Sequence, residues 1–318
     1  MEKLDLRPQN FNDFIGQNHL KETLKTIIDS SVKQNKELPH MLFYGPPGMG
    51  KTTLASIISN ASGNQIHYVQ GSNIEKKSDL ISMLSVLNEN EILFIDEIHS
   101  VNKNIVEFIY NAMEDFVFDL IIGVEGNSKS MRMKIKPFTL IGATTKINEI
   151  SQPLKDRFGY IGRIINYNED DILKILINTS KKLKLDIDKD ILKIIIDYSR
   201  LTPRIANNII QRVNDFAISK NNGIIDKKII EKTMKSMEIY RYGLTNEHIQ
   251  YLKILRDGFS ERPASLNTIS SLTLGEKNDI LIEIEPILLF LKLIEKNSRG
   301  RKITSKGINY LIEQNLIR

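Results

Sequence analysis

Cysteine is absent from this chain of 318 residues, and its absence excludes several kinds of chemistry. The chain cannot form disulfide bonds, thiolate metal sites or a cysteine nucleophile. This composition is compatible with a cytoplasmic location, which we expect.

Long apolar segments are also absent. No apolar run reaches the roughly 18 residues of a membrane-spanning helix, and the longest candidate, residues 280–294, is interrupted by charged residues and a proline. The first residues lack a basic region followed by an apolar core, so we expect no signal peptide. We therefore expect no membrane partner.

The composition that remains is that of a globular protein. Hydrophobic residues make up 41% and charged residues 26%, which argues against disorder. The length exceeds that of one ordinary core, so we expect two or three domains. The net charge of +5 and the pI of about 9.0 permit a nucleic-acid partner, but an ordinary, mildly basic protein fits them equally well.

Short apolar runs alternate with helical patterns in the first half of the chain. Residues 41–44, 92–95 and 138–141 have the continuous apolar character of buried parallel strands. A helical pattern follows the first run from Lys51 to about Asn60. This alternation predicts an α/β domain with a parallel sheet.

The segment between the last two runs predicts a β-hairpin. Residues 116–122 and 131–135 have strand character, and the turn formers Gly126, Asn127 and Ser128 lie between them. Its apolar residues Ile121, Ile122 and Met131 can either contact a partner or pack on the sheet. The residues by themselves leave both interpretations open.

Helical periodicity dominates from about Glu169, and a further compact segment follows Gly243. We find no internal repeats and no low-complexity tract. The predicted domains are residues 1–167, 168–242 and 243–318.

Residues 45–52 read GPPGMGKT and match the phosphate-binding pattern G-x-x-x-x-G-K-[ST]. Glycines let backbone N–H groups turn toward phosphate oxygens, and the following helix presents its positive end to the same anion. Lys51 supplies charge to the β- and γ-phosphates of ATP, and Thr52 supplies a hydroxyl to Mg²⁺. The predicted nucleotide contacts from this loop are Gly45, Pro46, Pro47, Gly48, Met49, Gly50, Lys51, Thr52 and Thr53.

The apolar run 92–95 ends in Asp96 and Glu97, at the sheet edge where ligands bind in open α/β folds. Asp96 is the predicted Mg²⁺ ligand with Thr52. Glu97 is the predicted general base, a role typically worth about 10²–10⁴-fold in rate. We expect His99 to be structural, because no second histidine or carboxylate lies at metal-ligand spacing.

These motifs resemble the AAA+ ATPases and, more closely, the RuvB family, whose members drive branch migration of Holliday junctions. The resemblance covers essentially the whole chain and is densest from Leu6 to Arg204. It implies an α/β AAA+ P-loop NTPase core with a parallel sheet, a small helical lid domain and a C-terminal winged-helix domain. The segments that carry it are Leu6-Arg7-Pro8, residues 14–17, 43–55, 96–99, 112–116, 137–145 and 153–159, with residues 202–207 on the lid.

The resemblance also implies roles for particular residues. Thr145 corresponds to sensor 1, near the γ-phosphate. Arg157 corresponds to an arginine finger that acts on ATP bound by the neighbouring subunit, an effect worth about 10³–10⁵ in rate. Arg204 corresponds to sensor 2. The residues implied around the adenine are Arg7, Pro8, Phe14, Ile15 and Tyr167.

Partners are implied in the same way. The hairpin at about 117–135 corresponds to the insertion that docks onto RuvA, the junction-binding partner. Arg299, Arg301 and Lys302 would face the phosphate backbone of duplex DNA from the wing. Such contacts add affinity without reading sequence, so we expect salt-sensitive, sequence-tolerant binding. The resemblance also implies a homohexameric ring, a resolvase partner, and a role in recombination, repair and the SOS response.

This chain departs from the family pattern at several positions. Lysine replaces the usual arginine at Lys146 and Lys155, and residues 261–265 and 287–297 diverge, which weakens the match in the last domain. A second hypothesis is a clamp-loader-like or initiator-like AAA+ switch, but clamp loaders usually carry Ser-Arg-Cys at the finger motif. A third hypothesis, a non-catalytic DNA-binding scaffold, conflicts with intact Glu97 and Arg157.

Overall fold

The computed structural model describes residues 6–122, 129–259, 262–273 and 276–317. The chain divides into two compact units. One comprises residues 1–184 with 201–204, and the other comprises residues 185–200 with 205–318. Within the described part of the chain, no helix has the length and apolar character needed to cross a membrane.

A five-stranded, fully parallel sheet is the centre of the first unit, with strand order β2-β3-β6-β1-β7. The predicted strands at 41–44, 92–95 and 138–141 are the three adjacent inner strands. Because they are covered on both faces, they carry mostly apolar residues on both sides of the strand. The strands are β1 (Met41–Tyr44), β2 (Ile66–Gln70), β3 (Ile92–Asp96), β6 (Thr139–Thr144) and β7 (Tyr160–Arg163).

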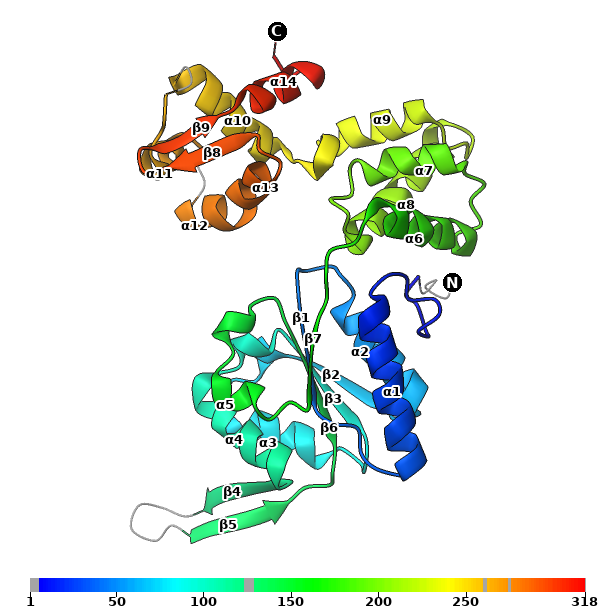
Figure 1. Ribbon diagram of the computed structural model, residues 1–318, viewed down its shortest axis with the longest axis vertical. Helices are drawn as coiled ribbons and strands as arrows, with labels where there is room; N and C mark the ends of the chain where they lie inside the picture. The colour runs from blue at the N-terminus through cyan, green and yellow to red at the C-terminus, as the bar shows by residue number, and fades with distance from the viewer. Residues whose placement is uncertain (1–5, 123–128, 260–261, 274–275, 318) are drawn as a thin grey trace. The chain divides into compact units, whose positions relative to one another are not determined.

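Helices cover both faces of this sheet (Figure 1). On one face lie α1 (Asn18–Gln34) and α2 (Lys51–Ser62). On the other lie α3 (Lys77–Ser85), α4 (Lys103–Glu114) and α5 (Gln152–Lys155).

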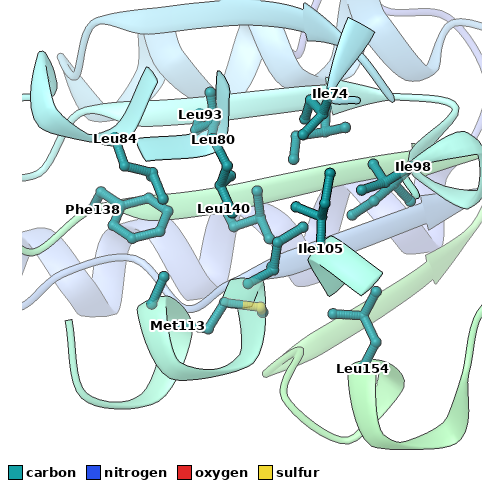
Figure 2. Packing of buried hydrophobic residues seen from close by; sticks show 14 of the residues in the cluster. Ile74, Leu80, Leu84, Leu93, Ile98, Ile105, Met113, Phe138, Leu140 and Leu154 are labelled. Carbon is teal, nitrogen blue, oxygen red and sulfur yellow. The ribbon is translucent and has the colours of Figure 1, made fainter. Parts of the chain in front are cut away.

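The second face of the sheet is sealed by one apolar core (Figure 2). Leu93 and Leu140 of the sheet meet side chains of the covering helices, including Leu80 and Ile105. Full burial of each such side chain contributes about 1.5–3 kcal/mol. Ile98, the residue after the Asp96-Glu97 pair, belongs to the same core, which therefore anchors the chain directly beside these two carboxylates.

The predicted hairpin is present as β4 (Val117–Ile122) and β5 (Lys129–Lys134), paired antiparallel. It extends away from the domain (Figure 1). Phe118 at its base is buried in the core, whereas Met131 is 46% exposed. The predicted turn at 126–128 and the side chains of Ile121 and Ile122 lie outside the described residues.

Helices follow the sheet domain, as the periodicity predicts. Three of them begin at a side-chain cap, because Asn168, Asp188 and Asp226 each accept a hydrogen bond from a backbone N–H in the first turn. The helices are α6 (Glu169–Lys182), α7 (Lys189–Ile196), α8 (Pro203–Lys220) and α9 (Lys227–Ser236).

The C-terminal segment forms a winged helix around its own apolar core. The wing hairpin pairs with Ala264 of the divergent segment, because Ala264 and Arg301 exchange two backbone hydrogen bonds of 2.8 Å. The predicted fold class is therefore confirmed in all three of its parts. The elements are α10 (Asn246–Phe259), α11 (Leu266–Thr273), α12 (Lys277–Asp279), a π-helical turn (Ile280–Ile284), α13 (Glu285–Phe290), β8 (Ile294–Asn297), β9 (Gly300–Ile303) and α14 (Ser305–Glu313).

Candidate active site

The topology of the sheet brings the predicted catalytic motifs to one edge. β6 lies between β3 and β1, so its C-terminal end stands between the ends of those two strands. The phosphate-binding loop follows β1, Asp96 and Glu97 end β3, and Thr145 follows β6. Parallel strands present their carboxyl ends at a shared edge, where α/β folds bind ligands.

Two glycines of the loop are required by its geometry. Gly45 has φ 155°, and a Cβ there would lie 2.5 Å from the carbonyl oxygen of Ile164. Gly50 has φ 101°, and its Cβ would lie 3.1 Å from the ring of Phe14. The loop is therefore wrapped closely by neighbouring chain, which leaves its backbone N–H groups in a defined concave turn.

Lys51 begins α2 and lies inside this loop. Its ammonium group donates hydrogen bonds to the carbonyl oxygens of Gly45 (2.9 Å) and Pro46 (3.0 Å). Burial lowers the pKa of Lys51, while the carboxylates of Glu97 and Asp96 act in the opposite direction. A phosphate in the loop would stabilise the charged form further, because it places negative charge beside a desolvated cation.

Thr52 and Asp96 fit the chemistry of Mg²⁺. The hydroxyl of Thr52 donates to Asp96 Oδ2 at 3.3 Å, so two hard oxygen ligands lie together beside the loop. Among the described residues there is no group of three or more acidic, histidine or cysteine side chains that could hold a metal. In nucleotide enzymes Mg²⁺ binds through one or two protein ligands, and phosphates and water fill its remaining sites.

Glu97 is held by the residues around it. Thr145 donates two hydrogen bonds to Glu97 Oε2, from its backbone N–H (2.9 Å) and from its hydroxyl (3.0 Å). His99 Nδ1 lies 3.1 Å from the same oxygen. The predicted base and the predicted sensor 1 are thus in direct contact, and His99 joins them, although the sequence motifs assigned it no catalytic part.

The segment predicted to surround the adenine lies against the phosphate-binding loop. Phe14 and Tyr167 are buried, and the Tyr167 hydroxyl donates to the carbonyl oxygen of Met49 at 3.3 Å. Desolvation raises the pKa of Tyr167, so its hydroxyl stays protonated and able to donate. Ile15 and Pro8 are half-buried, and Arg7 is exposed.

Gln17 is a residue of this segment to which the motifs assigned no separate role. Its side-chain amide donates to the carbonyl oxygen of Ile165 at 2.7 Å and accepts from the Ile165 N–H at 3.1 Å. This pairing ties the N-terminal segment to the chain just before Tyr167.

Arg157 has its partners on α4 and α5 rather than at the phosphate-binding loop. Its guanidinium donates to Glu114 Oε2 (3.1 Å) and to the carbonyl oxygen of Pro153 (2.7 Å), and it stacks 4.5 Å from the ring centre of Tyr110. Among the described residues, Arg157 Nε is left buried without a hydrogen-bond partner. Motif reasoning assigned no role to the side chains of Glu114 and Tyr110, because their contacts with Arg157 arise only in the folded chain.

The backbone of Arg204 contacts the phosphate-binding loop. Its N–H donates to the carbonyl oxygen of Gly48 at 3.4 Å, and its side chain is exposed. Its positive charge contributes to lowering the pKa of Lys51.

The three basic residues predicted for DNA binding differ in their surroundings. Arg299 lies exposed at the turn of the wing, and Lys302 is paired with Glu295 at 3.5 Å. Arg301 Nε donates to Glu285 Oε1 at 2.6 Å, and the Glu285 side chain is only 2% exposed. Arg301 therefore neutralises a buried carboxylate in addition to any contact with phosphate.

The family of the chain follows from comparison with known proteins. Residues 6–164 match the family described as the Holliday junction DNA helicase RuvB P-loop domain. Residues 167–240 match the RuvB AAA lid domain, and residues 241–312 match the RuvB C-terminal winged helix domain. The chain belongs to the RuvB family. The predicted domain boundaries, with the first domain ending at residue 167 and the second at residue 242, stay a prediction.

Individual RuvB proteins resemble this chain over its full length. The RuvB subunit of the Holliday junction branch migration complex of Mycoplasmopsis synoviae (strain 53) is 62% identical over 311 residues, or 98% of each chain. The corresponding protein of Mycoplasmopsis pulmonis (strain UAB CTIP) is 50% identical over 98% of each chain. The structure of the Thermotoga maritima RuvB Holliday junction branch migration motor has a TM-score of 0.80 and 33% identity, covering 96% of this chain and 98% of that one.

Proposed function

We propose that this protein is an ATP-driven motor subunit that promotes branch migration of Holliday junctions in recombination and repair. It acts as a hexameric ring on duplex DNA, together with a RuvA-type partner. The observation that carries the proposal is the contact between Glu97 and Thr145 at the edge of the sheet, beside the phosphate-binding loop. That arrangement suits an enzyme that hydrolyses ATP and senses the γ-phosphate.

The residues of the site divide the chemistry among them. The loop and Lys51 would hold the phosphates, and Thr52 and Asp96 would hold Mg²⁺, which would neutralise charge on the phosphate oxygens. Glu97 takes the proton of the attacking water through the oxygen that Thr145 leaves accessible. Thr145 is close enough to the base to link the state of the phosphate to its position.

A ring explains the location of Arg157. Its contacts with Glu114, Tyr110 and Pro153 belong to a different part of the domain from the loop that binds ATP in the same subunit. An arginine finger supplied to a neighbouring subunit has this property, and it completes the site only when subunits assemble. Hydrolysis at one interface then moves the lid and winged-helix domains that contact DNA.

The remaining parts of the proposal concern partners and location. The hairpin contacts the RuvA-type protein, the wing contacts DNA phosphates through Arg299, Arg301 and Lys302, and a resolvase joins the complex. The protein works in the cytoplasm and within the SOS response.

The test is ATP hydrolysis by wild type, Glu97→Gln and Arg157→Ala, with and without duplex DNA and the RuvA-type partner. We expect both variants to lose at least about a hundredfold in turnover. A one-to-one mixture of the two variants reports whether the subunits share sites. Wild type should also move a synthetic four-way junction.

Each outcome bears on a different part of the proposal. Normal hydrolysis by Arg157→Ala would remove the finger assignment. Hydrolysis by wild type that leaves the junction unmoved would favour the clamp-loader-like or initiator-like switch.

A further inference from the structure

His99 lies where it can control the orientation of Glu97. Its side chain is 12% exposed, and its Nδ1 lies 3.1 Å from Glu97 Oε2 and 2.9 Å from the hydroxyl of Thr144. The metal-ligand interpretation has no support among the described residues, where no cluster of suitable ligands includes it. Its contacts point instead to the predicted base.

Two groups lie within reach of Nδ1 of His99, the hydroxyl of Thr144 and Glu97 Oε2. Thr144 Oγ1 already accepts the N–H of Lys146 at 2.9 Å. If Nδ1 of His99 carried a lone pair, that lone pair would face a carboxylate oxygen at 3.1 Å with no hydrogen between them. The contact is favourable when Nδ1 carries a hydrogen, which is shared with the hydroxyl of Thr144 at 2.9 Å and lies beside Glu97 Oε2 at an ion-pair distance of 3.1 Å.

One oxygen of Glu97, Oε2, therefore accepts two hydrogen bonds, from the N–H and the hydroxyl of Thr145. Nδ1 of His99 lies beside the same oxygen at ion-pair distance. A carboxylate held by one oxygen in this way leaves the other oxygen, Oε1, to face the attacking water. Preorganised donors fix a reacting group without reorganisation at the moment of reaction.

The backbone around Glu97 is shaped for the same contact. Glu97 has φ 48° and ψ 52°, a left-handed conformation that is costly for a residue other than glycine. The short 3-10 helix Ile98–Ser100 follows at once, with Ile98 buried in the core of Figure 2. This turn brings the side chain at position 99 back beside the side chain at position 97.

Thr145 cannot hold Glu97 with its hydroxyl and serve a phosphate at the same time, because a threonine hydroxyl has one hydrogen to donate. When that hydrogen turns to the γ-phosphate, Glu97 Oε2 keeps the Thr145 N–H and His99. We infer that His99 is a positioning residue that holds Glu97 in its hydrolytic orientation while the Thr145 hydroxyl engages ATP. This inference rests on the proposed role of Glu97 as the base.

The test compares three substitutions of His99 in the full-length protein with DNA present. His99→Leu removes the donor, and we expect kcat to fall by about 10- to 100-fold, with KM and the affinity for a non-hydrolysable ATP analogue changed less than twofold. His99→Asn places an amide N–H near the former Nδ1 and should restore kcat to within about threefold of wild type. His99→Gln places its amide near the former Nε2 and should not restore it.

His67→Leu is a matched control. His67 also pairs with a carboxylate, Glu91, at 2.8 Å, but away from the nucleotide motifs. Its loss should alter thermal stability and leave kcat unchanged.

Glu97→Gln separates failure of this inference from failure of the proposed function. If Glu97→Gln hydrolyses ATP normally, Glu97 is not the base, and the proposed mechanism fails first. If Glu97→Gln is inactive while His99→Leu keeps the wild-type kcat, only the role of His99 is overturned. The role of His99 would also be overturned if folded His99→Asn had a kcat as low as that of His99→Leu. A rise in the KM of His99→Leu that matched its loss of kcat would overturn it too. If His99→Leu does not fold, the comparison of His99→Asn with His99→Gln decides.

Discussion

At the scale of single residues, the orientation of Glu97 depends on a glycine that touches no phosphate. A Cβ at Gly71 would lie 2.5 Å from the carbonyl oxygen of Glu97 and 2.8 Å from Ser100 Oγ. That carbonyl is already fixed by the N–H of Ser100 at 2.8 Å and its hydroxyl at 2.7 Å. Any added atom at position 71 must therefore move the catalytic turn.

Gly71→Ala should lower ATP turnover by about a hundredfold, because a displacement near 1 Å at a catalytic group has that effect. Steady-state hydrolysis measures it, with circular dichroism to confirm folding. Gly258→Ala is the matched control, because a Cβ there meets open space within α10. The control should keep full activity and gain about 0.5–1 kcal/mol of stability. Full activity in Gly71→Ala would contradict the close contact.

His248 gives the C-terminal unit a dependence on pH. It is 4% exposed, and desolvation together with the positive charge of Arg200 lowers its pKa from 6.5 to about 4. Glu247 and the backbone of Glu283 act in the opposite direction and do not cancel these effects. Between these two pH values the unfolded chain binds a proton that the folded chain does not.

The stability that depends on neutral His248 should be complete above pH 6.5 and should decline as the pH falls toward 4, by no more than about 3 kcal/mol. Urea unfolding at several pH values measures it. In His248→Asn, which cannot titrate, this part of the decline should disappear. An identical pH dependence in variant and wild type would show that His248 does not contribute.

At the scale of structural elements, the wing contains two arginines with different physical roles. Arg301 is paired with buried Glu285, which also accepts hydrogen bonds from Tyr251 (2.9 Å) and Lys296 (3.5 Å). Arg299 lies at the exposed turn. A substitution at each position should therefore change a different measurement.

Arg301→Ala should destabilise the protein by about 3–5 kcal/mol, because it leaves Glu285 buried without its main counter-charge. Arg299→Ala should change stability by less than about 0.5 kcal/mol. It should instead reduce the slope of log affinity for DNA against log salt by about 1. Unfolding curves and DNA titrations at several salt concentrations test both. Unchanged DNA affinity in Arg299→Ala, together with an unchanged slope, would remove the wing from the DNA interface.

At the scale of the whole molecule, the hairpin combines a structural base with an exposed methionine, Met131. Phe118 is 1% exposed within the core, and the partly buried Met133 packs against that core. Farther out, Met131 is 46% exposed. The base therefore supports the fold, and the side chain of Met131 is available for contact with another protein.

Replacing residues 120–131 by a short Gly-Ser turn should abolish binding of the RuvA-type partner and leave basal ATP hydrolysis unchanged, because the base stays intact. A pull-down and a hydrolysis assay measure the two effects. Phe118→Ala is the contrasting variant and should lose about 3–5 kcal/mol of stability. Unchanged partner binding after the replacement would refute docking through the hairpin.

The sequence by itself determined the parts of this protein whose chemistry is local. The glycines and Lys51 of the phosphate-binding loop, the strand that ends in Asp96 and Glu97, and the hairpin are readable because neighbouring residues carry the whole signal. Apolar runs and turn formers follow directly from backbone geometry. The α/β domain with a parallel sheet could be predicted for the same reason, whereas the winged helix was implied by the resemblance to the RuvB family.

The tertiary structure alone decided which side chains meet across distant elements. Glu97 meets Thr145 and His99 because β6 lies beside β3 and the chain turns left-handed at Glu97. Arg157 meets Glu114 across 43 residues of chain, and Arg301 meets Glu285 across 16. The sequence identifies a charged residue but does not show whether its side chain faces solvent, DNA or a buried carboxylate. Only packing removes water from around it, and that loss of water decides whether the residue binds a partner, supports the fold or positions the catalytic base.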